Sequence, residues 1–321
     1  MPRKASQDDE RDGVPLTNLD QELFDGAGAT KRDLVDYLDA LSDRLVPALR
    51  DRPLSVIRVR PGQPPFMQKN LPKYTPEWIA TTEVWADRSR RMVTYGLCND
   101  RRTLLWFANQ RAVEYHPALA TADRPAHPTH LILDLDPPEG GAFRLAAQAA
   151  LLVREVLTAC GMAGVAKTSG AKGAHVFVPL EPEATHDDVA AATRAVAARA
   201  ERLDPKLATT AFIVEQREGK VFVDSTRAGG ATVVAAYSPR LRPGVPVSFP
   251  LAWDDLESAV PGDYTLHTAA SALGGDDPWA RLMPPPQRLD PGLVEQGHTI
   301  PIARVVAMHE GKRRARERRG E

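Results

Sequence analysis

The stretch LILDLDPPEGGAFRLAAQAALLVREVLTACGMAGVAKTSGAKGAHVFVPL, residues 131 to 180, decides the fold. Its apolar opening predicts a strand, and its alanine-rich middle predicts a helix that Gly161 ends. Two short strands joined by the turn SGAKG follow. The expected elements are a strand at 131–136, a helix at 143–160, and strands at 165–169 and 174–180. This order predicts an α/β or α+β module whose sheet is covered by helices on one face and open on the other.

The flanking segments extend the pattern in both directions. Downstream we expect a helix over 186–203, with acidic residues in its first turn, and strands at 212–215, 220–224 and 231–237. Upstream we expect a helix over 30–49, capped by Thr30, and strands at 91–97 and 102–108. The polar residues 1–14 are expected to be disordered, and the proline-rich segment 284–292 to wrap around the domain.

Composition is ordinary for a globular protein, with 43% of residues hydrophobic and 26% charged. No apolar run approaches the roughly 18 residues that span a bilayer, and the start MPRKASQDDERDG holds no secretion signal. Cys98 and Cys160 form no C-x-x-C pair, so we expect neither a structural zinc site nor a disulfide framework. The cytoplasm is therefore the expected compartment, without a membrane partner.

The net charge of −1 does not by itself predict a nucleic-acid partner, but basic residues gather in clusters. They lie at 50–60, at Lys69 and Lys73, and in the tail KRRARERR (312–319). The tail is either a solvated, mobile end or a phosphate-seeking arm.

Three aspartates stand where strands end. Asp134 and Asp136 are two apart in one expected strand, so both carboxylates face the same side, while Leu133 and Leu135 face the core. Asp224 ends the expected strand KVFVD. If these strands are neighbours, the three carboxylates converge as in a two-metal phosphoryl-transfer site. Alternatively, each is an ordinary aspartate at a strand-to-turn junction.

The turn SGAKG is either a polar hairpin or a cradle for phosphate. Its glycines allow successive N–H groups to point at one anion, and Ser169 and Lys172 add a hydroxyl and a charge. His175, at the start of the next strand, could turn toward the same anion. The spacing is not that of a Walker A loop, and a strand follows where that loop needs a helix.

Three further residues lie within reach of this edge. A lone histidine such as His116 is more often structural than catalytic. Arg227 and Arg240 follow Asp224 and would either neutralise the carboxylates or grip a triphosphate.

Together, LILDLDPP, KTSGAKGAHVFVPL and VFVDSTRAGGATVVAAYSPRLRPGVPVSFPLAWDDL resemble the polymerase domain of bacterial ligase D, a member of the archaeo-eukaryotic primase superfamily. The resemblance continues through LLWFANQRAVEYHP and NLDQELFDGAGATKRDLVDY and covers about residues 15 to 285. It implies one polymerase or primase domain over 15–300, with an N-terminal subdomain at about 15–125. The catalytic core, at about 126–285, would contain a sheet of RNA-recognition-motif type with flanking helices. The basic tail would occupy 301–321.

The resemblance also implies roles for single residues. Asp134, Asp136 and Asp224 would be the catalytic ligands of two Mn²⁺ or Mg²⁺ ions. The residues implied to hold the nucleotide are His116, Ser169, Lys172, His175, Arg227 and Arg240. Phe66 would stack on a template base, Lys31 would contact a downstream 5′-phosphate, and Lys69 is expected to contact DNA.

The sequence departs from the family pattern at three places. Gln21 stands where a lysine for the 5′-phosphate is common, and Met67 stands where a second aromatic is common. The loop STRAGGAT after Asp224 is about one residue shorter than usual, which leaves the role of Arg227 open.

These observations predict a template-dependent primase-polymerase that adds nucleotides, preferably ribonucleotides, to primer ends or gaps in DNA repair. Its expected partners are DNA with a primer-template, gap or broken end, an NTP or dNTP, a separate ATP-dependent DNA ligase and an end-binding protein, at the nucleoid. No K-x-D-G ligase motif is found, so a stand-alone polymerase is expected. One alternative is a non-catalytic DNA-end-binding module that recruits a ligase. Another is a two-metal nuclease or phosphatase, which would leave the SGAKG loop and the arginines unexplained.

Overall fold

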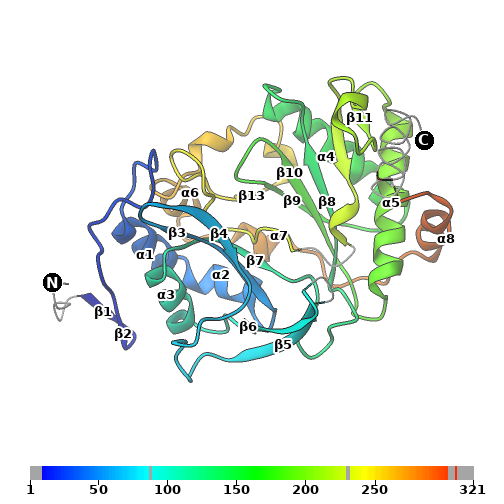
Figure 1. The fold of residues 1–321 in the computed structure, drawn as a ribbon. Helices are drawn as coiled ribbons and strands as arrows, with labels where there is room; N and C mark the ends of the chain where they lie inside the picture. The colour runs from blue at the N-terminus through cyan, green and yellow to red at the C-terminus, as the bar shows by residue number, and fades with distance from the viewer. Residues whose placement is uncertain (1–8, 87–88, 229–231, 303–307, 309–321) are drawn as a thin grey trace, which may run out of the picture.

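The computed structural model describes residues 9–86, 89–228, 232–302 and 308. In that part of the chain, one sheet has the strand order β11-β12-β8-β10-β9-β13, and a second has the order β4-β3-β6-β5, with β7 also paired to β3 (Figure 1). The strands are β1 (Glu10–Arg11), β2 (Val14–Pro15), β3 (Leu54–Arg60), β4 (Gln63–Gln68), β5 (Thr81–Ala86), β6 (Arg91–Gly96), β7 (Ala112–Pro117), β8 (His130–Asp136), β9 (Val165–Thr168), β10 (Ala174–Pro179), β11 (Ala208–Thr209), β12 (Val221–Asp224) and β13 (Pro250–Leu251).

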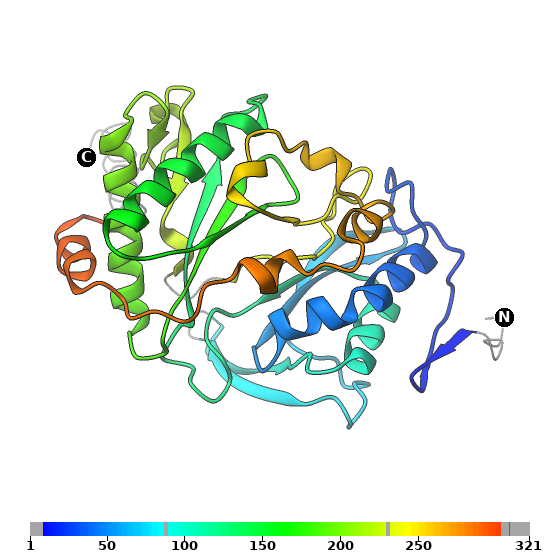
Figure 2. The ribbon, with the colours of Figure 1, turned by 180° about the vertical axis from the view of Figure 1, so that it is seen from behind.

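Helices cover both sheets. They are α1 (Lys31–Ala40), α2 (Ser42–Leu49), α3 (Arg101–Asn109), α4 (Phe143–Ala159), α5 (His186–Leu203), α6 (Ala269–Leu273), α7 (Pro278–Leu282) and α8 (Pro291–Thr299). Seen from behind, α4 crosses the larger sheet and α1, α2 and α3 gather beside the smaller one (Figure 2). The helix-covered face of the larger sheet is apolar, since Leu131, Leu133 and Leu135 of β8 lie in the main core. The alternate residues Asp134 and Asp136 therefore face the other side.

The central prediction from the sequence is confirmed. The segment 131–180 forms strand β8, helix α4 and the antiparallel strands β9 and β10, and α5 spans His186–Leu203. Thr30 caps α1 through a side chain that accepts from the Asp33 N–H, as expected. The expected helix over 30–49 is, however, two helices, because Leu41 leaves helical geometry with φ −105° and ψ 13°.

The expected strand at 102–108 is wrong, since these residues lie within α3. Asp100 caps this helix by accepting from the Thr103 N–H at 2.7 Å. The run Leu104–Ala108 is buried on every side, so it shows no periodicity that separates a helix from a strand.

Two further expected strands are also wrong. The segment at 212–215 runs into a short 3₁₀ helix, η2 (Val214–Gln216), in which Val214 is exposed and has no sheet to pack on. Within 231–237, residue 231 lies outside the described residues, and the backbone that follows is irregular. Its N–H groups make isolated hydrogen bonds to other segments instead of a strand ladder. Ala235, for example, donates to the Tyr115 carbonyl.

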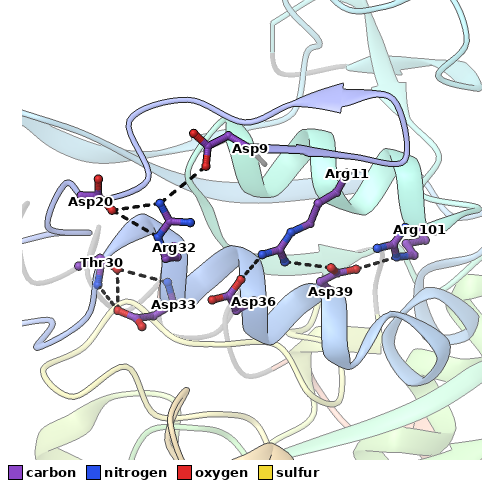
Figure 3. Close-up of polar contacts among 9 residues, drawn as sticks. All are labelled: Asp9, Arg11, Asp20, Thr30, Arg32, Asp33, Asp36, Asp39 and Arg101. Atoms are coloured by element: carbon purple, nitrogen blue, oxygen red, sulfur yellow. Dashed lines mark hydrogen bonds and ion pairs between the residues drawn. The ribbon is translucent and has the colours of Figure 1, made fainter. Parts of the chain in front are cut away.

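The expectation of disorder through residue 14 is wrong for the described part of that segment. β1 and β2 pair with each other, and arginine–aspartate ion pairs join this N-terminal segment to α1, and α1 to α3 (Figure 3). Arg11 contacts Asp36 and Asp39, and Arg101 contacts Asp39 at 2.6 Å. Charge pairing thus orders a segment that has little apolar surface to bury. Residues 1–8 and the basic run 312–319 lie outside the described residues.

No helix among the described residues is both long and apolar enough to cross a membrane. Cys98 and Cys160 are both free thiols, as expected.

Candidate active site

Strand pairing brings the three aspartates to one edge. β12 lies beside β8 in antiparallel register, with Asp224 directly opposite Asp134 and Phe222 opposite Asp136. On the other side of β8, His175 of β10 is opposite Asp134. The neighbouring strands that the sequence analysis required are therefore present, and Asp134 is the residue on which both pairings meet.

Arg227, in the 3₁₀ helix η3 (Thr226–Ala228), lies against this carboxylate pair. Its Nη2 is 3.2 Å from Asp134 Oδ2, and its Nε is 3.4 Å from Asp224 Oδ2. Burial works to raise the pKa of Asp134, but His175 and then Arg227 outweigh it and hold that pKa at about 2. At Asp136, burial and then the charge of Asp134 raise the pKa, against the weaker lowering effects of Lys172 and Arg217.

These carboxylates suit hard cations such as Mg²⁺ and Mn²⁺, which prefer oxygen ligands. Burial is the main cause of the raised pKa of Asp136, and the charge of Asp134 adds to it, so a nearby cation would favour the ionised form. As the described residues stand, however, no group of three or more His, Cys, Asp or Glu side chains is gathered closely enough to hold an ion. The guanidinium of Arg227 takes that place between Asp134 and Asp224, so the donor chemistry fits a metal only when Arg227 moves.

The SGAKG turn packs tightly against the end of β8. A methyl group on Gly173 would lie under 3.0 Å from the Leu135 carbonyl oxygen, between the two aspartates of that strand. Ser169 Oγ accepts from the N–H groups of Ala171 and Gly173, at 3.2 and 3.1 Å. Its own O–H therefore remains available as a donor. Lys172 is exposed at the mouth of the cavity.

His175 is held on both sides of its ring. Nε2 lies 3.2 Å from Asp134 Oδ1, and Nδ1 lies 2.8 Å from the ammonium of Lys167. Burial, followed by the charge of Lys167, lowers the pKa of His175 to about 4. A neutral ring that accepts from Lys167 at Nδ1 carries its proton on Nε2 and donates it to Asp134. In this arrangement both ring nitrogens of His175 contact protein side chains, and His175 orients the Asp134 carboxylate.

The sequence analysis missed Lys167 and Glu114. Lys167 is fully buried, and burial together with Arg240 lowers its pKa well below the ordinary value. The signal for it was its place opposite His175 in the β9–β10 hairpin. Glu114 lies in the buried strand β7, where a charged residue is unusual. It stands two residues before His116 on the same face, and this spacing was the signal for it. Its carboxylate contacts His116, 2.8 Å from Nε2, and lies 3.1 Å from Arg240 Nε.

A cavity of about 660 Å³ joins most of these groups. It lies between the open face of the larger sheet and residues of the smaller sheet. The predicted site residues that line it are Lys69, His116, Asp134, Asp136, Ser169, Lys172, His175, Arg227 and Arg240. Asp224 lies behind this lining, beside Asp134.

Two predicted DNA contacts lie elsewhere. Met67 lines the cavity, whereas Phe66, its neighbour in β4, points to the opposite face and carries the guanidinium of Arg60 at 4.7 Å from its ring centre. Lys31 is 2% exposed, and its ammonium donates to the Thr17 carbonyl and, at 2.6 Å, to Asn109 Oδ1. Burial, followed by the charge of Arg111, lowers the pKa of Lys31 to about 8.

Comparison with known proteins adds an independent finding. Residues 30–279 match the model of the family described as LigD, primase-polymerase domain. The chain is 34% identical over 265 residues to the bifunctional non-homologous end joining protein LigD of Bacillus subtilis. It is also 34% identical over 256 residues to the multifunctional non-homologous end joining DNA repair protein LigD of Mycobacterium tuberculosis. These matches cover 81% and 76% of this chain but only 42% and 33% of the relatives.

Among solved structures, the polymerase domain from Mycobacterium tuberculosis ligase D in complex with DNA is similar to this chain. The TM-score is 0.76 at 31% identity, and the match covers 84% of this chain and 97% of that one. The expected mixed α/β architecture of the archaeo-eukaryotic primase fold is therefore confirmed.

Proposed function

The chain belongs to the LigD primase-polymerase domain family, and from this premise we propose that it is a template-dependent nucleotidyltransferase acting in DNA repair by non-homologous end joining. It would add nucleotides, preferably ribonucleotides, to a primer end or into a gap. The observation that carries the proposal is the strand register, which sets Asp134, Asp136 and Asp224 together beside a cavity lined by cationic side chains. The Mycobacterium tuberculosis domain, solved in complex with DNA, supports DNA as the partner.

The side chains around the cavity would have different binding roles. Lys172, Arg240 and His116 would bind the triphosphate, and the free O–H of Ser169 would donate to it. His175 would hold Asp134 in place through its Nε2 proton. Phe66 and Lys69 would contact the template strand. Lys31 would contact a downstream 5′-phosphate only after its ammonium leaves Thr17 and Asn109, where it is buried in the present arrangement.

The carboxylates of Asp134, Asp136 and Asp224 would hold two Mn²⁺ or Mg²⁺ ions, which supply activation of the primer 3′-hydroxyl and stabilisation of phosphate charge when bound. Arg227 must leave Asp134 and Asp224 for this to happen, since it neutralises both in the present arrangement. We propose that Arg227 then contacts the nucleotide. A separate DNA ligase and an end-binding protein would complete repair in the cytoplasm, at the nucleoid.

The position of Arg227 also favours a second candidate, a DNA-end-binding module without catalysis. Arg227 already satisfies two of the three carboxylates, so the site is electrostatically stable without an ion. Such a module would bind gapped DNA and recruit a ligase but would incorporate no nucleotide.

Primer extension separates the two candidates. A labelled primer on gapped DNA is incubated with Mn²⁺ and either ribonucleotides or deoxyribonucleotides, using the wild-type protein, Asp134→Ala and the exposed control Asp263→Ala. We expect extension by the wild type and the control and none by Asp134→Ala. Gap binding by a wild-type protein that fails to extend would favour the non-catalytic module.

A further inference from the structure

Glu114 joins the two sheets at the wall of the cavity. It is 4% exposed, and both of its carboxylate oxygens are in use. Oε2 contacts His116 Nε2 at 2.8 Å, whereas Oε1 accepts from the Leu241 N–H at 2.8 Å and lies 3.1 Å from Arg240 Nε. His116 stands on β7, and Arg240 stands on the segment that returns from the larger sheet. One carboxylate thus links an imidazole and a guanidinium that are far apart in the chain.

The surroundings of Glu114 keep its carboxylate ionised, so it acts as a fixed negative charge and does not transfer protons. Burial works to raise its pKa, but His116 and Arg240, together with the Leu241 N–H, hold that pKa at about 2. The carboxylate is therefore ionised at any ordinary pH, and both of its oxygens are engaged by protein groups. Glu114 can act on the reaction only through its neighbours.

Arg240 is positioned by Glu114 but keeps N–H groups that can donate to a ligand. Its Nε lies within ion-pair distance of the carboxylate but is not aligned for a hydrogen bond, and Nη1 donates to the Ser169 carbonyl. Nη2 has no acceptor among the residues that the structure describes. The guanidinium is therefore anchored between β7 and the SGAKG turn, with donor capacity left for an anion.

The backbone around Glu114 is tied down in the same region. The Tyr115 N–H donates to Ser238 Oγ at 2.9 Å, and the Ala235 N–H donates to the Tyr115 carbonyl at 2.9 Å. β7 and the segment before Arg240 are thus fixed relative to each other independently of the Glu114 side chain. Removing the charge of Glu114 should loosen two side chains and leave the backbone in place.

We propose that Glu114 is a positioning residue that sets His116 and Arg240 at a fixed separation for the triphosphate of the incoming nucleotide. The inference rests on the function proposed above and assigns Glu114 a part in it. Without this negative charge, the guanidinium of Arg240 and the nearby ammonium of Lys172 would lack a fixed counter-charge before the nucleotide arrives. Preorganising charged groups in this way lowers the free-energy cost of binding a flexible ligand.

The test uses Glu114→Gln, which keeps the size and the acceptor for Leu241 but removes the charge. Glu201→Gln is the matched control, since Glu201 also accepts from several groups, including Thr210 Oγ1 at 2.7 Å, but lies on α5, outside the cavity lining. Binding of inorganic tripolyphosphate is measured by calorimetry, without DNA. We expect Glu114→Gln to weaken it about 10- to 100-fold, the range for losing a hydrogen bond to a charged group. Glu201→Gln should bind like the wild type.

Two kinetic readouts distinguish positioning from general damage. Glu114→Gln should raise the KM for nucleotide far more than it lowers kcat, with a melting temperature no lower than that of Glu201→Gln. The effects of Glu114→Gln and Arg240→Lys on tripolyphosphate affinity should be strongly non-additive, because the first residue acts through the second.

Wild-type affinity in Glu114→Gln, an equal loss in Glu201→Gln, or additive losses with Arg240→Lys would each overturn the inference. A wild-type protein that binds tripolyphosphate but never extends DNA would overturn the proposed function instead, and would leave the role of Glu114 in anion binding standing.

Discussion

Gly173 offers a sharp test of how the SGAKG turn supports the site. A methyl group added there would lie under 3.0 Å from the carbonyl oxygen of Leu135. That oxygen belongs to the backbone of β8, so it cannot move aside without shifting the strand that carries Asp134 and Asp136. Gly262 is the matched control, because a methyl group there would meet nothing within 4 Å. Neither glycine has a positive φ, so the comparison isolates the steric contact.

Gly173→Ala overpacks the contact with β8, and overpacking lowers the free energy of unfolding by about 1–3 kcal/mol. For a chain of 321 residues, that corresponds to a fall in melting temperature of roughly 1.5–4.5 °C. Because a displacement near 1 Å at reacting groups costs about 100-fold in rate, we expect kcat for primer extension to fall about 10- to 100-fold. Gly262→Ala should change neither quantity, or should stabilise by a few tenths of a kcal/mol.

The assay is a thermal melt followed by extension kinetics at a temperature where both variants are folded. If Gly173→Ala melts and extends like Gly262→Ala, the turn does not press against β8, and the placement of Asp134 and Asp136 by this turn is wrong.

Three further predictions concern single side chains. The folded-state pKa of Lys31 is lowered to about 8, so the folded protein binds fewer protons than the unfolded chain between pH 8 and 10.5. Stability relative to Lys31→Met should therefore rise by about 3 kcal/mol across that window, as measured by urea unfolding, and a constant difference would contradict it. Burial, followed by Arg52, lowers the pKa of His130 to about 3, so stability should fall as the pH drops from 6.5, by less than about 1.4 kcal/mol per pH unit. In His130→Gln, the free energy of unfolding measured with urea should not fall with pH in this way. An unchanged fall would exclude His130 as its source. Phe66→Ala should weaken binding to DNA with a single-stranded template overhang by about 1–3 kcal/mol in fluorescence anisotropy. Met67→Ala, on the opposite face of β4, is the comparison, and equal losses would argue against stacking on Phe66.

The sequence specified the catalytic half better than the N-terminal half, for a physical reason. In β8, Leu133 and Leu135 pack in the main core and alternate with Asp134 and Asp136 on the other face, so the sequence alone indicates a strand. In α3 all the central residues are buried, and the same run of apolar letters fits a strand equally well. The N-terminal segment is short and mostly polar, and its order depends on tertiary contacts: Val14 and Leu16 pack in the main core, and Arg11 pairs with Asp39.

The site could be predicted where its residues follow the strand pattern, and less well where they depend on tertiary contacts. Asp136 and Asp224 end β8 and β12, and the register places Asp224 opposite Asp134. Lys167 and Glu114 matter because of partners on other strands and loops, which no local spacing reveals. Similarly, the neutralisation of Asp134 and Asp224 by Arg227 depends on the conformation of η3 and could not be deduced from the order of the residues.

The central claim is that Asp134, Asp136 and Asp224 hold the catalytic cations beside the triphosphate cradle. Anomalous diffraction from crystals soaked with Mn²⁺ and a non-hydrolysable ribonucleoside triphosphate tests it most directly. We predict manganese peaks bounded by the three carboxylates, with Arg227 withdrawn from them and the triphosphate on Lys172 and Arg240. Manganese bound elsewhere, or Arg227 still in contact with Asp134 and Asp224 when the nucleotide is bound, would contradict the account.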